Sequence, residues 1–397
     1  MSISRGTTDD VGFFGVASGA TVTNLTIEGS VYGANNVGIL AGSFTGAAEN
    51  CHVKGSARTA SDCVGGLIGY FEGTATNCTF NGTVKGSSDC VGGLIGKSGS
   101  SDLKSCRANA EVKGTKYVGG LIGYVLATVT SSDKSIDDCF ASGTVSGSSN
   151  VGGLIGAMDT SAFRKLKTDT STSSYSYYEY ATAPYKYIVS NCGAKTSISA
   201  SSSVGGLIGQ TLGFVYTYNF RIKYDYSDYT YPWDWTFSNE KAVRCMDVTG
   251  CFALAQIKAT GSDAGGVIGK CNSTNVSDSY FNGSIVGGNS ITQYQGIGGI
   301  CGAITAPATV TITDRDGKQH TRTVNSTDAS AISRNYSRAT IAGSKYVGGI
   351  IGNITSNATV TSNFALNPVL SASVGPVARI SPTTTDGFGA IGSLTTN

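Results

Sequence analysis

The chain of 397 residues contains 55 glycines but only 6 prolines, and charged residues make up 14% of it against about 25% in ordinary soluble domains. A formal net charge of +2 supplies no field that attracts nucleic acid or anionic lipid, so neither is an expected partner. Low charge with 40% apolar residues also excludes a disordered chain and indicates many short strands joined by tight turns.

One apolar strand recurs along the chain. Identical copies of Val-Gly-Gly-Leu-Ile-Gly begin at Val64, Val91, Val118, Val151 and Val204, and looser copies begin at Val11, Val37, Ala264, Ile297, Val347 and Val374. The first five starts lie 26 or 27 residues apart, which is too short a period for tetratricopeptide or propeller units. No helical periodicity runs through the unit, so we expect a strand at each copy.

A second strand follows in every unit, as in residues 78–84, where alternate side chains are small or apolar and one face is therefore buried. The positions equivalent to Cys78 are Leu25, Cys51, Cys106, Cys139, Cys192, Cys251, Ser279, Asn335 and Asn363. Two clear strands and a short third make one triangular coil. The expected fold class is all-β, a right-handed parallel β-helix (β-solenoid) of about ten coils of about 27 residues.

We interpret residues 1–397 as a single β-solenoid domain, and expect it to be a fragment of a larger protein because neither end carries a capping segment. Three insertions interrupt the repeat, at residues 157–190, 210–245 and 303–330. All three lengthen the same leg of their coils, so they should leave the rod at one corner. The first two belong to consecutive coils and should lie side by side.

The first two insertions are rich in aromatic residues, holding twelve of the 20 tyrosines and both tryptophans. Tyrosine and tryptophan offer large, rigid contact area with a polar tip, as in binding sites for proteins and sugars. The candidate ligand-binding residues are Tyr177, Tyr178, Tyr180, Tyr224, Tyr226, Tyr229, Tyr231, Trp233 and Trp235. The alternative is structural: the aromatic residues form a hairpin that covers the side of the rod.

The third insertion predicts a hairpin, with Thr-rich segments 309–313 and 321–324 flanking Asp316-Gly317. The sequence Asp314-x-Asp316-Gly317 is similar to the start of a calcium loop. The remaining ligands and the terminal glutamate of such a loop are missing, so we expect no metal and no cofactor.

The 11 cysteines follow the repeat. Six fall in the inward column of Cys78, and Cys63 and Cys90 share another column, so a ladder of small buried side chains is the favoured interpretation. A ladder does not converge on a point as metal ligands must. Disulfides between rungs are the second alternative, and Cys245 with Cys251 is the pair to test for oxidation.

The sequence offers little for catalysis. His52 and His320 are the only histidines, and neither has an evident serine or cysteine partner, so we expect no nucleophile–histidine–acid triad. Asp62 and Asp89 occupy equivalent turns of adjacent coils, where turn formation is the favoured role. A carboxylate pair of a polysaccharide lyase or glycosidase is the alternative.

The strand Val64-Gly65-Gly66-Leu67-Ile68-Gly69, followed by Asn77-Cys78 and a Gly-rich return, resembles the GLUG motif. That motif occurs in large extracellular bacterial proteins, among them gut surface proteins, adhesins and streptococcal immunoglobulin A peptidases. The peptidases carry catalysis in a separate zinc domain, whose His-Glu-x-x-His signature is absent here.

The resemblance implies an extracellular or cell-surface location, with an export signal and flanking domains missing from this chain. Three functions remain open: a non-catalytic module whose aromatic loops bind a glycan or a host or cell-surface protein, a purely structural stalk, and a carbohydrate-active β-helix enzyme. We favour the first. Exposed aromatic side chains would support it, and fully buried ones would support the stalk.

Overall fold

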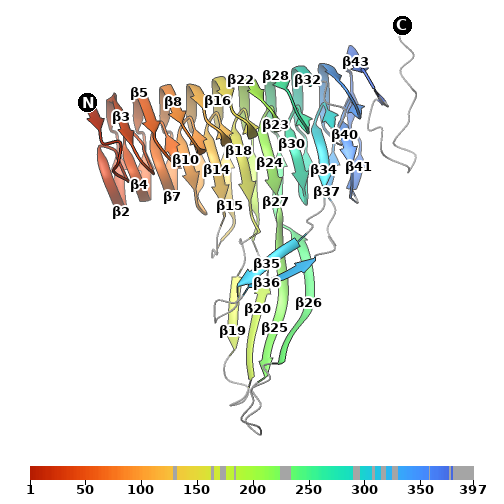
Figure 1. Ribbon diagram of the computed structural model, residues 1–397, viewed down its shortest axis with the longest axis horizontal. Helices are drawn as coiled ribbons and strands as arrows, with labels where there is room; N and C mark the ends of the chain where they lie inside the picture. Colours follow the sequence, from red (N-terminus) through yellow and green to blue (C-terminus); the bar gives the residue numbers. More distant parts are fainter. Residues whose placement is uncertain are drawn as a thin grey trace.

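The computed structural model describes residues 1–127, 132–161, 165–169, 176–182, 185–223, 234–288, 296–305, 309–313, 319–323, 330–356, 358–374 and 377–378. The coils stack into a long rod, and a smaller antiparallel sheet extends from one side of it (Figure 1). Three long parallel sheets line the rod, which confirms the all-β parallel β-solenoid predicted from the repeat.

Sheet A is a 12-stranded parallel sheet formed by the second strand of each coil. Its strands are β1 (Ser2–Ser4), β3 (Thr26–Gly33), β5 (His52–Thr59), β8 (Thr79–Gly86), β12 (Arg107–Lys113), β16 (Phe140–Ser146), β22 (Gly193–Ala200), β28 (Phe252–Ala259), β32 (Tyr280–Gly287), β38 (Tyr336–Gly343), β42 (Phe364–Ala365) and β43 (Val369–Ala372). Phe80 pairs with Val53 on one side and with Ala108 on the other, as the repeat alignment requires.

Sheet B holds the short Val-Gly strands of nine coils. They are β6 (Val64–Gly65), β9 (Asp89–Gly92), β13 (Lys116–Gly119), β17 (Ser149–Gly152), β23 (Ser202–Gly205), β29 (Ala264–Gly265), β33 (Ile297–Gly298), β39 (Val347–Gly348) and β44 (Val377–Ala378). Their glycines are sterically required, since a Cβ on Gly92 would lie 1.9 Å from the carbonyl oxygen of Ile95. Val91, Leu94 and Ile95 are completely buried, as are their equivalents in neighbouring coils.

Two corners of each coil contain a residue in the left-handed region. The residue before the Cys78 column has φ between 49° and 63° at Asn24, Asn50, Asn77, Ser105, Asp138, Asn191, Gly250, Asp278, Arg334 and Ser362. The residue before the Val-Gly pair of sheet B is also left-handed, with φ of 59° at Cys63 and 58° at Cys90. Asparagine, aspartate and glycine tolerate this conformation best, which explains why Asn-Cys recurs in the sequence.

Sheet C changes form along the rod. In the first coils one long strand spans it: β2 (Phe14–Thr23), β4 (Ala41–Glu49) and β7 (Ile68–Thr76). The later coils have two half-strands each, and β7 pairs with both members of the first such pair. These pairs are β10/β11 (Ile95–Ser98, Asp102–Lys104), β14/β15 (Ile122–Leu126, Lys134–Asp137), β18/β21 (Ile155–Asp159, Tyr187–Ser190), β24/β27 (Ile208–Leu212, Met246–Thr249), β30/β31 (Ile268–Asn272, Thr274–Ser277), β34/β37 (Cys301–Thr305, Ser330–Ser333) and β40/β41 (Ile351–Ile354, Ala358–Thr361).

All three insertions leave the rod at the break between two half-strands of sheet C: after β18, after β24 and after β34. The lengths of the repeats predicted that all three insertions leave the rod at the same corner, and this break in sheet C is that corner. The third insertion forms the hairpin of β35 (Thr309–Thr313) and β36 (Gln319–Thr323), which are antiparallel.

The last repeat is in a different register from the one predicted. Sheet B continues at β44, where Val377 pairs with Val347, and not at Val374. Three residues separate β38 from β39 in the preceding coil, whereas a start at Val374 would leave only Ser373 to turn the corner after β43. The amide of Val374 instead donates to the carbonyl of Ser344 within that turn.

Candidate functional site

The first two insertions build one sheet outside the rod, here called the lateral sheet. It consists of β19 (Lys165–Asp169) and β20 (Ser176–Thr182) from the first insertion, and β25 (Phe214–Lys223) and β26 (Asp234–Arg244) from the second. The order is β19-β20-β25-β26, and every pairing is antiparallel. Because β20 pairs with β25, two segments far apart in sequence form a single four-stranded surface (Figure 1).

Four of the nine candidate binding residues lie on strands of the lateral sheet: Tyr177, Tyr178 and Tyr180 on β20, and Trp235 on β26. Trp235 pairs with Ile222 of β25, and Ile222 pairs with Tyr177. The backbone therefore places Trp235 and Tyr177 in one row across three strands. The other five, Tyr224, Tyr226, Tyr229, Tyr231 and Trp233, lie outside the described residues.

The lateral sheet joins the rod through buried groups. Tyr187, near the end of the first insertion, is completely buried, and its hydroxyl donates to the carbonyl of Ser101 at 2.8 Å. Thr160, near the start of that insertion, donates from Oγ1 to the carbonyl of Leu212 at 2.8 Å, and Cys245 donates from Sγ to Thr160 Oγ1 at 3.1 Å. These bonds tie the start of one insertion to the end of the other, so both are anchored to the rod at one place.

Ion pairs surround the same anchor. Lys186 Nζ lies 2.7 Å from Asp247 Oδ2, and Lys134 Nζ lies 3.0 Å from Asp102 Oδ2. Close by, a surface cleft of about 500 Å³ is lined by Thr74, Thr76, Asp102, Leu103, Lys104, Ser135, Asp137, Ile188 and Ser190. Asp102 also accepts the amide of Ser135, so its carboxylate serves to hold neighbouring coils together.

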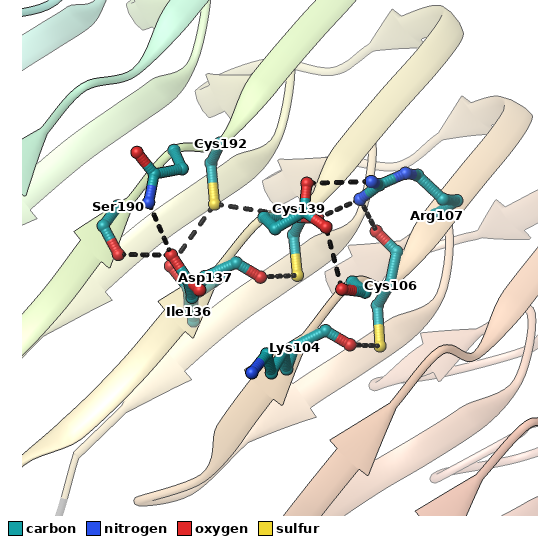
Figure 2. A network of polar contacts seen from close by, with 11 residues as sticks. Lys104, Cys106, Arg107, Ile136, Asp137, Cys139, Ser190 and Cys192 are labelled. Carbon is teal, nitrogen blue, oxygen red and sulfur yellow. Dashed lines mark hydrogen bonds and ion pairs between the residues drawn. The ribbon is translucent and has the colours of Figure 1, made fainter.

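The Cys78 column is a hydrogen-bonded ladder, whose central part is drawn in Figure 2. Cys78, Cys106 and Cys192 each donate from Sγ to the carbonyl that lies three residues before the equivalent position of the preceding coil. Asn335 and Asn363 continue this pattern with their amide groups. These side chains therefore tie neighbouring coils together at the corner where the backbone turns left-handed, whereas Cys139 and Ser279 donate to a carbonyl of their own coil.

All 11 cysteines are buried and free. Cys245 and Cys251, the pair singled out for oxidation, bond to different groups: Cys251 donates to the carbonyls of Val189 and Thr249, whereas Cys245 donates to Thr160 and the carbonyl of Gly213. No group of three or more histidine, cysteine, aspartate or glutamate side chains within the described part of the chain could hold a metal ion.

The remaining candidate polar residues have structural partners. Asp62 accepts the amide of Asp89 at 3.2 Å, and burial raises the pKa of the Asp89 carboxyl. His52 Nδ1 lies 2.9 Å from Thr79 Oγ1 on the next coil. The side chain of His320 lies outside the part of the chain described.

Sequence reasoning missed an aromatic row on the outer face of sheet A. The rings of Phe252 and Tyr280 are stacked, with centroids 5.5 Å apart and planes 13° apart, and Phe140 lies 6.1 Å from Phe252. The signal was present in the repeat alignment, because these residues all follow the Cys78 column directly. The row occupies outward positions of the strands, so a pattern of inward positions alone does not predict it.

Comparisons with known proteins agree with the repeat. The family model of the GLUG motif matches residues 60–85, which confirms the resemblance for that segment. A solved structure from Bacteroides ovatus, described as a putative immunoglobulin A1 protease, shares 13% sequence identity and a TM-score of 0.33, covering 76% of this chain and 74% of that chain. A likeness at this level carries no argument about activity. The curated proteins give no match, and the described residues contain no helix long and apolar enough to cross a membrane.

Proposed function

We propose that this chain, a β-solenoid that carries a GLUG motif, is a non-catalytic binding module of the cell exterior that presents its lateral sheet to a glycan or to a host or cell-surface protein. The observation that carries the proposal is the pairing of β20 with β25. If the two insertions served only to cover the side of the rod, pairing into one sheet that extends away from it would not be required (Figure 1).

Two further features support this role. The anchor at Tyr187, Thr160 and Cys245 fixes the base of the lateral sheet, so a ligand would meet a preformed surface. The sheet and the segment that follows β25 contain the candidate tyrosines and both tryptophans. Aromatic side chains of this kind dominate the energetics of protein and sugar recognition.

Intrinsic tryptophan fluorescence tests the proposal, because Trp233 and Trp235 are the only tryptophans and both belong to the second insertion. The chain is titrated with neutral and acidic polysaccharides, mucin and matrix proteins. A saturable change in emission for one ligand class is expected. Trp233→Ala, which keeps Trp235 as reporter, should weaken that ligand by about tenfold, as for an aromatic anchor.

Tyr32→Ala is the matched control, since Tyr32 is an aromatic residue of the rod with 37% of its surface exposed. Its affinity should stay within about twofold of the parent. A flat titration across the panel, with emission already blue-shifted as for buried indole, would overturn the proposal in favour of a structural stalk.

A further inference from the structure

The outer face of sheet A carries unpaired positive charge in one region. Five neighbouring strands, β16, β22, β28, β32 and β38, contain no aspartate or glutamate but include Lys195, Lys258 and Arg338. All three cations are exposed, and none has a carboxylate within ion-pair distance among the described residues. The overall charge of +2 conceals this local excess.

The other half of the same face differs. There Lys54 pairs with Glu28 at 3.0 Å, and Lys85 pairs with Glu111 at 3.3 Å. Both cations are already neutralised by a partner on an adjacent coil. Arg58 and Lys113 on this half are also exposed and have no carboxylate within ion-pair distance among the described residues, but Glu28 and Glu111 lie on the same half of the face. The region from β22 to β38 is therefore where an anion would meet positive charge with no carboxylate on the same strands.

The aromatic row lies beside Lys195 and Arg338, two residues along the strands, whereas Lys258 lies six residues along β28 from Phe252. Phe252 leans over Gly193, where a Cβ would lie 2.2 Å from the Phe252 ring, and so its ring reaches Phe140 two coils away. Tyr280, 39% exposed, continues the stack on the next coil. The glycine thus lets a continuous aromatic surface form along the rod instead of three separate rings.

Polar groups complete the surface. A cleft of about 410 Å³ is lined by Lys195, Thr196, Ser197, Leu254, Ala255, Gln256, Asn282 and Gly283. Lys195, Leu254, Asn282 and Arg338 stand in one row, because each pairs with the next in register. At ~4.8 Å per strand this row is about 14 Å long, and it lies about 7 Å from the aromatic row.

We propose that this face binds an anionic polysaccharide that runs along the rod, with a sugar ring on the Phe252–Tyr280 stack. Lys195, Lys258 and Arg338 pair with its sulfate or carboxylate groups, and Gln256 and Asn282 bond to its hydroxyls. Three cations spread over four coils neutralise a sparsely charged polymer better than the dense phosphates of a nucleic acid. Side-chain amides beside an aromatic plane suit sugar hydroxyls.

Affinity electrophoresis in gels that contain chondroitin sulfate, polygalacturonate, dextran or poly(dT) tests the proposal on the full chain. Chondroitin sulfate or polygalacturonate should retard migration, with dextran giving little effect and added salt weakening the retardation. Retardation by both anionic polymers assigns the site to carboxylate or sulfate alike, and retardation by chondroitin sulfate alone assigns it to sulfate. Equal retardation by dextran, tighter binding of poly(dT), or no retardation would each overturn the proposal.

The variant Lys195→Gln with Lys258→Gln and Arg338→Gln should lose about tenfold in affinity, because three exposed ion pairs are removed. Tyr280→Ala should lose about threefold through the stack. The matched control, Lys54→Gln with Lys85→Gln, removes exposed cations of the same face and should change affinity by less than about twofold. An equal loss in control and triple variant would mean a diffuse charge effect and would reject the site.

This site is independent of the lateral sheet, since β22, β28 and β32 lie on the side of the rod away from it (Figure 1). Trp233→Ala should therefore leave the retardation by chondroitin sulfate unchanged. If Trp233→Ala weakened the binding of chondroitin sulfate as well as of the ligand found by fluorescence, the anionic polymer would bind at the lateral sheet instead.

Discussion

At the scale of single residues, each coil is specified by a few positions with distinct physical demands. The alternation of small and apolar residues predicted the inward Cys78 column correctly. The sequence could not show that the column contains a chain of donors, because cysteine and asparagine share this role only once the carbonyl of the preceding coil is placed beside them. For Cys245 and Cys251, nearness in sequence was misleading, since a corner separates them.

Asn335 tests the ladder. It is completely buried, accepts the amide of Ser279 through Oδ1 at 3.0 Å, and donates to the carbonyl of Val276 at 2.9 Å. Asn335→Ala should lower the free energy of unfolding by about 2 kcal/mol, because buried partners are left unsatisfied. Asn335→Cys should recover part of this, since a thiol occupies the position in six coils. Urea denaturation measures both, and a cysteine variant as unstable as the alanine variant would contradict the ladder.

The buried thiols predict a loss of stability in alkali. Burial raises the pKa of Cys245 to about 12, against an ordinary value of 9.0. Between these two pH values the unfolded chain has lost the proton that the folded chain retains, so stability falls as pH rises from 9 toward 12 and is unaffected below 9. The free energy of unfolding from urea denaturation at pH 8, 10 and 11 should fall more steeply above pH 9 in the parent than in Cys245→Ala, by about 1.4 kcal/mol per pH unit. Equal slopes would show that Cys245 is exposed to solvent.

At the scale of elements, the sequence located the insertions and placed the first two side by side, because their coils are consecutive. It could not predict the bond between β20 and β25, since strand partners outside the repeat are not fixed by coil register. Nor did the lengths of the repeats reveal that sheet C divides into half-strands after β7.

Replacing residues 162–184 by a short Gly-Ser linker should expose one edge of β25. Residues Tyr218 to Lys223 pair with β20, and those not bonded to β26 would lose their hydrogen-bond partners. Deuterium uptake in this segment should become about tenfold faster, while uptake in β22 of the rod stays unchanged. Unaltered uptake in residues 218–223 would mean that the two hairpins are independent.

At the scale of the whole molecule, stability comes from contacts between neighbouring coils, so the coils at the two ends have a partner on one side only. The burial of the strands follows this rule. β22 buries five of its eight residues, whereas β2 and β43 bury none. The large apolar side chains most exposed among the described residues include Val16 and Phe364, at 65% and 64%.

Hydrogen exchange should therefore show a gradient along the rod. Amides of the rod strands β12, β16, β22 and β28 are expected to exchange only through the rarest openings, and amides of β2, β3 and β41 to β43 at least about tenfold faster. Mass spectrometry of peptides from each coil measures these exchange rates. Uniform protection from end to end would show that the solenoid unfolds as one cooperative unit.

The break in sheet C also gives the rod a series of insertion points at regular intervals, one in each coil with two half-strands. Half-strands on either side of the break continue from coil to coil whether the connection between them is short, as at Ser273, or as long as the segment between β24 and β27. Any peptide grafted at that point would stand a whole number of ~4.8 Å steps from the next. The number of displayed segments and the spacing between them can therefore vary independently in coils of this kind. An array of receptors spaced at the same intervals would bind several segments at once, and so more tightly than it would bind any single segment.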